Sequence, residues 1–143
     1  EMTTRKVRIS DMVALSAALQ NGDGHLKNFG LLYEDCAEDA DIRLAPAYDL
    51  VTTTVYQVND IMGLLLGDSK AWPKRKMLVQ FGRSACNLSE ARCNELLANV
   101  HRGMNRAMAE LSDYRDTHPA FEAVGEKMAV AWATGLARSI EPK

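Results

Sequence analysis

The chain has 143 residues, enough for one domain with a single hydrophobic core, and its 47% hydrophobic and 25% charged residues are typical of globular proteins. Its formal net charge of −2 argues against a general nucleic-acid-binding or membrane-surface protein, because such proteins usually carry a basic excess. Three cysteines without a Cys-x-x-Cys pair favour reduced thiols in the cytoplasm over a disulfide framework or a zinc site.

The first predicted element is a helix that starts at Ser10, a residue type that caps helix N-termini well. Apolar residues then recur at helical spacing over residues 12–19, a stretch far shorter than the ~20 residues that span a bilayer. The dipeptide Asn21-Gly22 is a strong turn signal, so we expect the helix to end there.

A β-hairpin is predicted next, with strands at residues 28–33 and 42–45 and an acidic, solvated tip at 34–41. Pro46 should end the second strand, because proline cannot donate a hydrogen bond to the ladder. Asp49 is therefore expected on an irregular turn, a usual place for a functional side chain.

The second half of the chain is predicted to be mainly helical after a short extended region. Residues 52–55 and 61–66 favour extended structure, and residues 67–69 favour a turn. Three helices should follow, and each has a start signal: Pro73, the cap Ser89, and the chain break at His118-Pro119. The first helix should run to about Gly82, and the last should begin at about Ala120. The sequence therefore predicts a mainly α protein, a helical bundle with a small β-hairpin in a single domain spanning residues 1–143.

Two motifs carry the candidate chemistry: Asn-Gly-Asp-Gly-His-Leu-Lys-Asn-Phe-Gly at 21–30 and Ala-Pro-Ala-Tyr-Asp-Leu at 45–50. They supply a carboxylate (Asp23), an amide (Asn28) and a second carboxylate (Asp49). In protein kinases a base Asp precedes a metal-binding Asn by the same separation, and a second metal-binding Asp follows later. We therefore predict Asp23 as the base and Asn28 with Asp49 as Mg²⁺ ligands.

Each motif residue also has an ordinary structural interpretation. Asn-Gly and Asp-Gly pairs are common tight-turn connectors, because these residues tolerate positive φ. His25 is either a turn residue bonded to backbone or a residue that organises the loop and approaches the nucleotide. Lys27 is either a solvated surface charge or a group that neutralises phosphate charge. The occurrence of both motifs in order favours the catalytic interpretation.

Together these motifs make the chain resemble the HipA-type bacterial toxin kinases, most strongly over residues 11–56 and more weakly to about Arg138. The resemblance implies the C-terminal lobe of a protein-kinase-like fold that transfers the γ-phosphate of ATP to a Ser/Thr hydroxyl of a protein substrate, with Mg²⁺ as cofactor. It also implies a toxin-antitoxin pair with a DNA-binding antitoxin partner.

No predicted segment of the chain corresponds to the N-terminal lobe that grips the nucleotide in such kinases. The chain also starts at Glu1 rather than Met, so we expect a fragment that is inactive alone. From the cysteines, the net charge and the short apolar stretches we expect a cytoplasmic protein with neither direct nucleic-acid binding nor membrane association. Two alternatives remain open: a non-catalytic interaction or regulatory module derived from a kinase lobe, and a small-molecule phosphotransferase.

Overall fold

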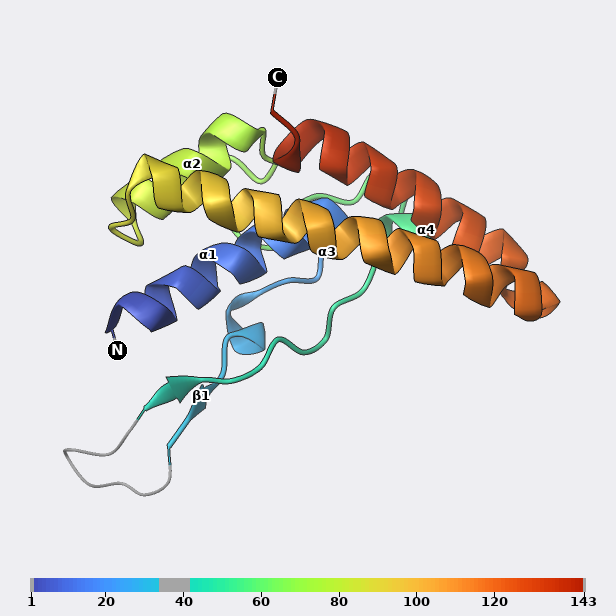
Figure 1. The fold of residues 1–143 in the computed structure, drawn as a ribbon, viewed down its shortest axis with the longest axis horizontal. Coiled ribbons are helices and arrows are strands. Elements are labelled where there is room, and N and C mark those ends of the chain that lie inside the picture. Colours follow the sequence, from blue (N-terminus) through green and yellow to red (C-terminus); the bar gives the residue numbers. More distant parts are fainter. Residues whose placement is uncertain (1, 34–41, 143) are drawn as a thin grey trace.

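The computed structural model describes residues 2–33 and 42–142, and this part of the chain is mainly helical with one small antiparallel sheet (Figure 1). The expected fold class, a helical bundle with a small β-hairpin, is therefore confirmed. Its α-helices are α1 (Met2–Leu19), α2 (Arg75–Ser84), α3 (Glu90–Thr117) and α4 (Glu122–Gly135). No helix of the described residues is long and apolar enough to cross a membrane.

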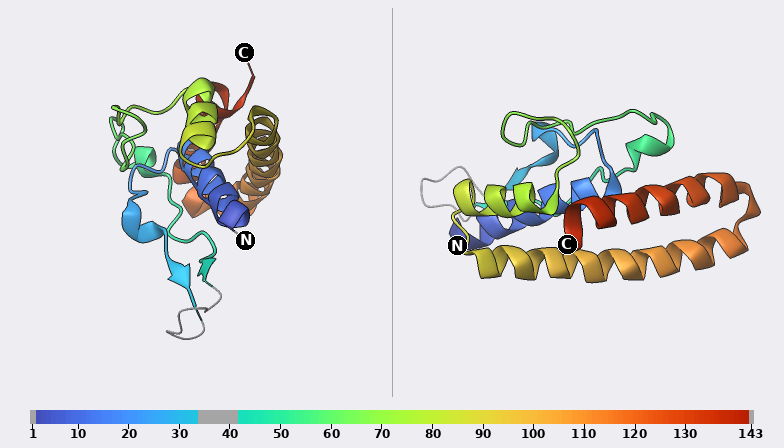
Figure 2. Two further views of the ribbon diagram at one scale, coloured as in Figure 1. Left: turned by 90° about the vertical axis from the view of Figure 1, so that its left-hand side faces the viewer. Right: turned by 90° about the horizontal axis from the view of Figure 1, so that it is seen from above.

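Helix α1 is the central element, and it packs against the three other helices. The long α3 runs past it, and α4 folds back antiparallel to α3 so that the far ends of both extend beyond the rest of the molecule (Figure 1). The motif residues and the connection over residues 50–70 lie on the opposite side of α1 from α3 (Figure 2, right). The bundle thus supports the candidate site from one side.

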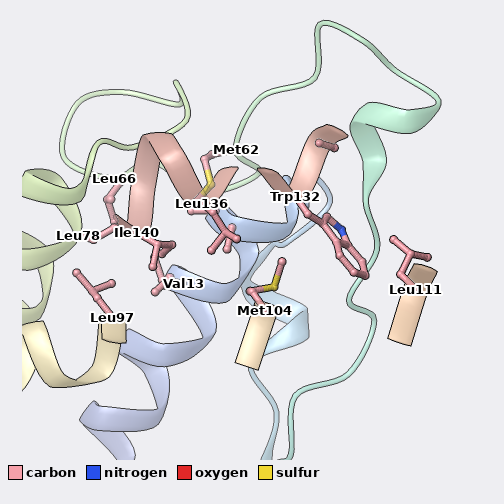
Figure 3. Close-up of a cluster of buried hydrophobic side chains, with 14 residues drawn as sticks. Val13, Met62, Leu66, Leu78, Leu97, Met104, Leu111, Trp132, Leu136 and Ile140 are labelled. Atoms are coloured by element: carbon pink, nitrogen blue, oxygen red, sulfur yellow. The ribbon is translucent and has the colours of Figure 1, made fainter. Parts of the chain in front are cut away.

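The main core fills the space between α1 and the other helices (Figure 3). Its larger members are Val13, Met62, Leu66, Leu78, Leu97, Met104, Leu111, Trp132, Leu136 and Ile140. Met62 and Leu66 come from the long connection before α2, so this irregular segment is anchored in the core although it contains no strand.

The predicted start of α1 is wrong, because the helix begins at Met2 and Ser10 lies inside it. Ser10 is buried, and its hydroxyl lies close to Gly82 of α2, where a Cβ would be 3.4 Å from the Ser10 Oγ. Val7 and Ile9 pack against a second small cluster of buried residues. Packing of the first turns thus extends the helix, while Ser10 serves a close helix–helix contact instead of a cap.

The helices of the second half begin close to the predicted residues. The Ser89 cap is confirmed, since its Oγ accepts a hydrogen bond from the Arg92 N–H at 3.1 Å. Helix α3 ends at Thr117, and Pro119 opens a short 3₁₀ turn before α4. A final π-helical segment, Leu136–Ile140, follows α4 and was not predicted.

Helices α1 and α4 approach each other so closely that their backbones touch. A Cβ added to Gly135 would lie 2.1 Å from the Ala18 carbonyl oxygen and 2.9 Å from that of Ala17. We expect Gly135→Ala to destabilise the protein by at least the about 1–3 kcal/mol typical of overpacking, because backbone atoms cannot move aside as side chains do. Gly103→Ala on α3 is the control, since a Cβ there meets nothing within 4 Å and should stabilise by up to ~1 kcal/mol. Urea unfolding measures both, and equal effects would contradict the close packing of α1 and α4.

The β-hairpin is confirmed but is shorter than predicted. Strand β1 (Leu31–Leu32) pairs antiparallel with β2 (Arg43–Leu44), with Leu31 opposite Leu44. The predicted tip at 34–41 lies outside the described residues. Strand β2 ends before Pro46, as expected, and Asp49 lies in irregular structure.

The two extended segments predicted after Asp49 are not strands. Thr53–Val55 forms a 3₁₀ turn, and Leu66 makes only a single bridge with Ser69. The predicted turn is present, because Gly67 adopts a φ of +65° between these bridge partners. Threonine hydroxyls bonded to neighbouring loops, described below, replace the sheet hydrogen bonds that β-propensity favours.

Candidate functional site

Most of the first motif lies in a loop, residues 20–28, that follows the C-terminus of α1. Gln20 makes the turn with a φ of +54°, and the Asn21 N–H still bonds the Ser16 carbonyl at 2.9 Å. Neither Gly22 nor Gly24 has a positive φ. The loop leads from a helix to a 3₁₀ turn, so the interpretation of Asn-Gly-Asp-Gly as a tight hairpin connector does not describe it.

Asn28 and Asp49, from the two motifs, are in direct contact. The Asn28 Nδ2 donates a hydrogen bond to the Asp49 Oδ2 at 3.0 Å. The Asn28 Oδ1 accepts the His25 N–H at 2.8 Å, and Asn28 itself is buried. The expectation that Asn28 starts a strand is wrong: it ends the 3₁₀ turn Leu26–Asn28, where its side chain bonds loop backbone.

Asp49 is exposed and adopts a φ of +56°, a left-handed conformation that Asp and Asn accept more readily than most residues. Its backbone carbonyl accepts a hydrogen bond from the Asn21 Nδ2 at 3.3 Å. The Tyr48 hydroxyl donates to the Lys27 carbonyl, which adds a further link between the motifs. Side chain and backbone of the second motif are therefore both fixed to the first.

Asn21 was predicted only as a turn residue, although it is 2% exposed and joins the end of α1 to Asp49. Its position directly before Gly-Asp was the available signal. Its Nδ2 makes this hydrogen bond, whereas its buried Oδ1 has no hydrogen-bond partner within the described residues. Asn21 thus holds the two motifs in register.

Asp23 is exposed between two neighbours that are held from the protein side. The Gly22 N–H donates to the Thr53 Oγ1 at 2.8 Å, and Gly24 is buried. Within residues 2–33 and 42–142, the Asp23 carboxylate has no hydrogen-bond or ion-pair partner. A free carboxylate on a fixed loop can accept a proton or a hydrogen bond from a molecule outside the protein.

His25 and Lys27 lie on the outer side of the same loop, and both are exposed. In the part of the chain that the structure describes, the Lys27 side chain has no hydrogen-bond or ion-pair partner, and backbone groups of both residues hold the loop together. Both interpretations of each side chain therefore stay open, and their roles stay predictions.

Three consecutive threonines form the inner wall of the site. The Thr53 Oγ1 donates to the Gln20 carbonyl at 3.1 Å while it accepts the Gly22 N–H, and the Thr54 Oγ1 donates to the Gln20 Oε1 at 2.9 Å. The Thr52 Oγ1 accepts the Trp132 Nε1–H at 2.7 Å in a buried contact with α4. Sequence reasoning missed these residues because it assessed their β-propensity and not their hydroxyl groups.

The contact between the motifs brings together side-chain oxygen atoms of the kind that bind hard divalent cations. Carboxylate and amide oxygens are preferred by Mg²⁺, which commonly binds one or two carboxylates together with substrate phosphates. The Asp49 Oδ1 makes no hydrogen bond within the described residues. The Asn28 side-chain Oδ1 accepts one hydrogen bond there, which leaves its second lone pair available for a cation. No group of three or more His, Cys, Asp or Glu side chains that could hold a metal occurs there. A cation at this site would therefore need ligands from a bound molecule or water.

Comparison with known protein families gives one match: the family model of HipA-like C-terminal domains covers residues 2–108. The match includes α1, both motifs, the threonine turn, α2 and most of α3. No curated protein matches the chain.

Proposed function

The chain belongs to the family of HipA-like C-terminal domains, and from this premise we propose that it is the catalytic lobe of a HipA-like serine/threonine kinase. In this proposal it transfers the γ-phosphate of ATP to a hydroxyl group of a protein substrate. The hydrogen bond between Asn28 and Asp49 is the observation that carries the proposal, because it joins the two motifs through residues that are 21 positions apart in the sequence. The β1–β2 hairpin brings the ends of both motifs close together, and this hydrogen bond fixes the two polar side chains beside each other.

The proposed chemistry assigns the proton to Asp23. The substrate hydroxyl donates its hydrogen bond to this carboxylate, and its oxygen forms a bond to the γ-phosphorus while the bond to the β–γ bridging oxygen breaks. The proton passes to the carboxylate, and ADP leaves. Positioning and charge stabilisation supply most of the acceleration in such reactions.

Asn28 and Asp49 are the residues proposed to hold Mg²⁺ through their side-chain oxygens. When bound, Mg²⁺ offsets the negative charge of the nucleotide phosphates. The Asn28 Nδ2 turns the Asp49 carboxylate so that its Oδ2 is occupied and its Oδ1 is available. His25 and Lys27, exposed on the same loop, are proposed to face the phosphates.

Further elements of the proposal come from the family resemblance. A second lobe, N-terminal in such kinases, would hold most of the ATP molecule, so the chain alone should be inactive. The kinase would act as the toxin of a toxin-antitoxin pair in the bacterial cytoplasm, with a DNA-binding antitoxin as partner.

The metal site can be tested with Mn²⁺, a paramagnetic ion that substitutes for Mg²⁺ and broadens the NMR signals of nearby nuclei. We expect Mn²⁺ to broaden the amide signals of residues 23–28 and 49 first, and excess Mg²⁺ to restore them. The acidic end of α3, with Asp113 and Asp116, provides the internal control for non-specific binding.

Broadening that begins at the end of α3, or is uniform over the acidic surface, would remove Asn28 and Asp49 from the metal site. The chain would then be better described as a non-catalytic module that keeps the shape of a kinase lobe.

A further inference from the structure

The connection between the threonine turn and α2 crosses directly over the loop that carries the proposed base. A Cβ added to Gly22 would lie 2.1 Å from the Asp60 Oδ2 and 2.6 Å from the Ile61 carbonyl oxygen. A Cβ added to Gly63 would lie 2.7 Å from the carbonyl oxygens of both Gly22 and Gly24. The connection is therefore in close contact with the backbone of Gly22 and Gly24, the two neighbours of the proposed base. No side chain of the loop lies between them, because both residues are glycines.

This connection is itself held firmly. The Asp60 carbonyl accepts the Trp72 Nε1–H at 2.9 Å, and the Asp60 N–H donates to the Gln57 carbonyl at 2.9 Å. The Met62 N–H bonds the Lys70 carbonyl at 2.9 Å, and the Met62 side chain is buried in the main core. The backbone of Asp60 is thus held in place, so its side chain can limit the movement of the loop at Gly22.

The Asp60 carboxylate contacts Gly22 and accepts a backbone hydrogen bond, and it forms no ion pair with any described residue. Its Oδ1 accepts the Ile61 N–H at 2.9 Å, while its Oδ2 faces the Gly22 Cα. Within residues 2–33 and 42–142 it belongs to no cluster of potential metal ligands. The Gly22 peptide is therefore held from two directions, by Thr53 at its N–H and by Asp60 at its Cα.

We propose that Asp60 is a positioning residue for Asp23, an inference that rests on the proposed phosphoryl transfer. No protein group in the described part of the chain holds the Asp23 side chain, so its direction is set by the backbone of Gly22 and Gly24. Displacement of a catalytic group by about 1 Å can cost about 10²-fold in rate. Asp60 prevents such a displacement by filling the space beside Gly22.

Single-turnover phosphoryl transfer by the complete kinase tests this role with Asp60→Ala and Asp60→Asn. Asp60→Ala should slow transfer by about 10–100-fold with an unchanged KM for ATP, because only the position of the base is disturbed. Asp60→Asn keeps the volume and the acceptor for the Ile61 N–H, so it should restore the parent rate. Asp68→Ala, an exposed carboxylate in the turn at 67–69, is the matched control and should have no effect.

Hydrogen exchange of the Gly22 and Gly24 amides in the present chain gives a readout that needs neither ATP nor transfer. Asp60→Ala should accelerate exchange at these amides, and Asp60→Asn should leave it as in the parent, provided that both variants unfold cooperatively. Inactivity of the parent kinase would contradict the proposed function alone, because the exchange comparison still decides whether Asp60 positions the loop.

Two results would overturn the positioning role. The first is an Asp60→Ala variant with parental exchange at Gly22 and Gly24. The second is an Asp60→Asn variant that transfers phosphate as slowly as Asp60→Ala although its exchange is parental, because the carboxylate would then act through its charge.

Discussion

Asp23→Asn is expected to slow phosphoryl transfer in the complete kinase by about 10²–10⁴-fold, the usual contribution of a general base, with nearly unchanged ATP affinity. Asparagine has almost the same size as aspartate but cannot take the proton of the attacking hydroxyl. The loop should keep its conformation, because its hydrogen bonds to Thr53 and Asn28 involve backbone groups of Gly22 and His25 and not the Asp23 side chain.

Single-turnover kinetics at saturating ATP measure this effect, since they separate transfer from binding and product release. Asp68→Asn makes the same chemical change in an exposed turn away from the motifs and should leave the rate unchanged. If Asp23→Asn retains a rate within about threefold of the parent, well short of the range for a general base, Asp23 is only a turn residue.

Asp49→Asn is expected to weaken Mg²⁺-dependent nucleotide binding by about 10–100-fold or more. Loss of a residue that only supports a metal ligand already costs about 10–100-fold, and Asp49 is proposed as a ligand itself. Asparagine accepts the φ of +56° at this position and can still accept a hydrogen bond from the Asn28 Nδ2. The fold should therefore be unchanged, whereas alanine would add a backbone cost of roughly 1–2 kcal/mol in the left-handed region.

Calorimetric titration of the complete kinase with ATP, with and without Mg²⁺, isolates the metal-dependent part of binding. The affinity measured without Mg²⁺ serves as the control and should be the same for parent and variant. An equal gain in affinity on adding Mg²⁺ to both proteins would exclude Asp49 as a ligand.

Sequence patterns predicted the elements of this fold best where a local signal acts alone. Ser89 caps α3 as expected because its hydroxyl serves the next turn of the chain. Ser10 has the same local signal, but packing against Gly82 and α2 outweighs it, and the helix continues through it. A cap signal thus fails where tertiary contacts bury the residue.

The candidate site could be predicted only in part, for a similar reason. The spacing of Asp23, Asn28 and Asp49 led to their prediction as site residues. The structure places the last two in direct contact. Asp60 and the threonine turn had no such pattern, because their contacts depend on how a long irregular connection crosses the loop. Residues of this kind become visible only in three dimensions.

The buried hydrogen bond between Trp132 and Thr52 shows that the end of the family match is not the end of the folded structure around the site. The family match ends at residue 108, but Trp132 of α4 lies beyond it and donates to the threonine turn that supports the loop of Asp23. A chain shortened at residue 108 would leave the Thr52 hydroxyl without its donor and uncover the face of α1 that Gly135 touches. The unit recognised by evolutionary similarity is therefore smaller than the unit that must fold for the site to keep its shape.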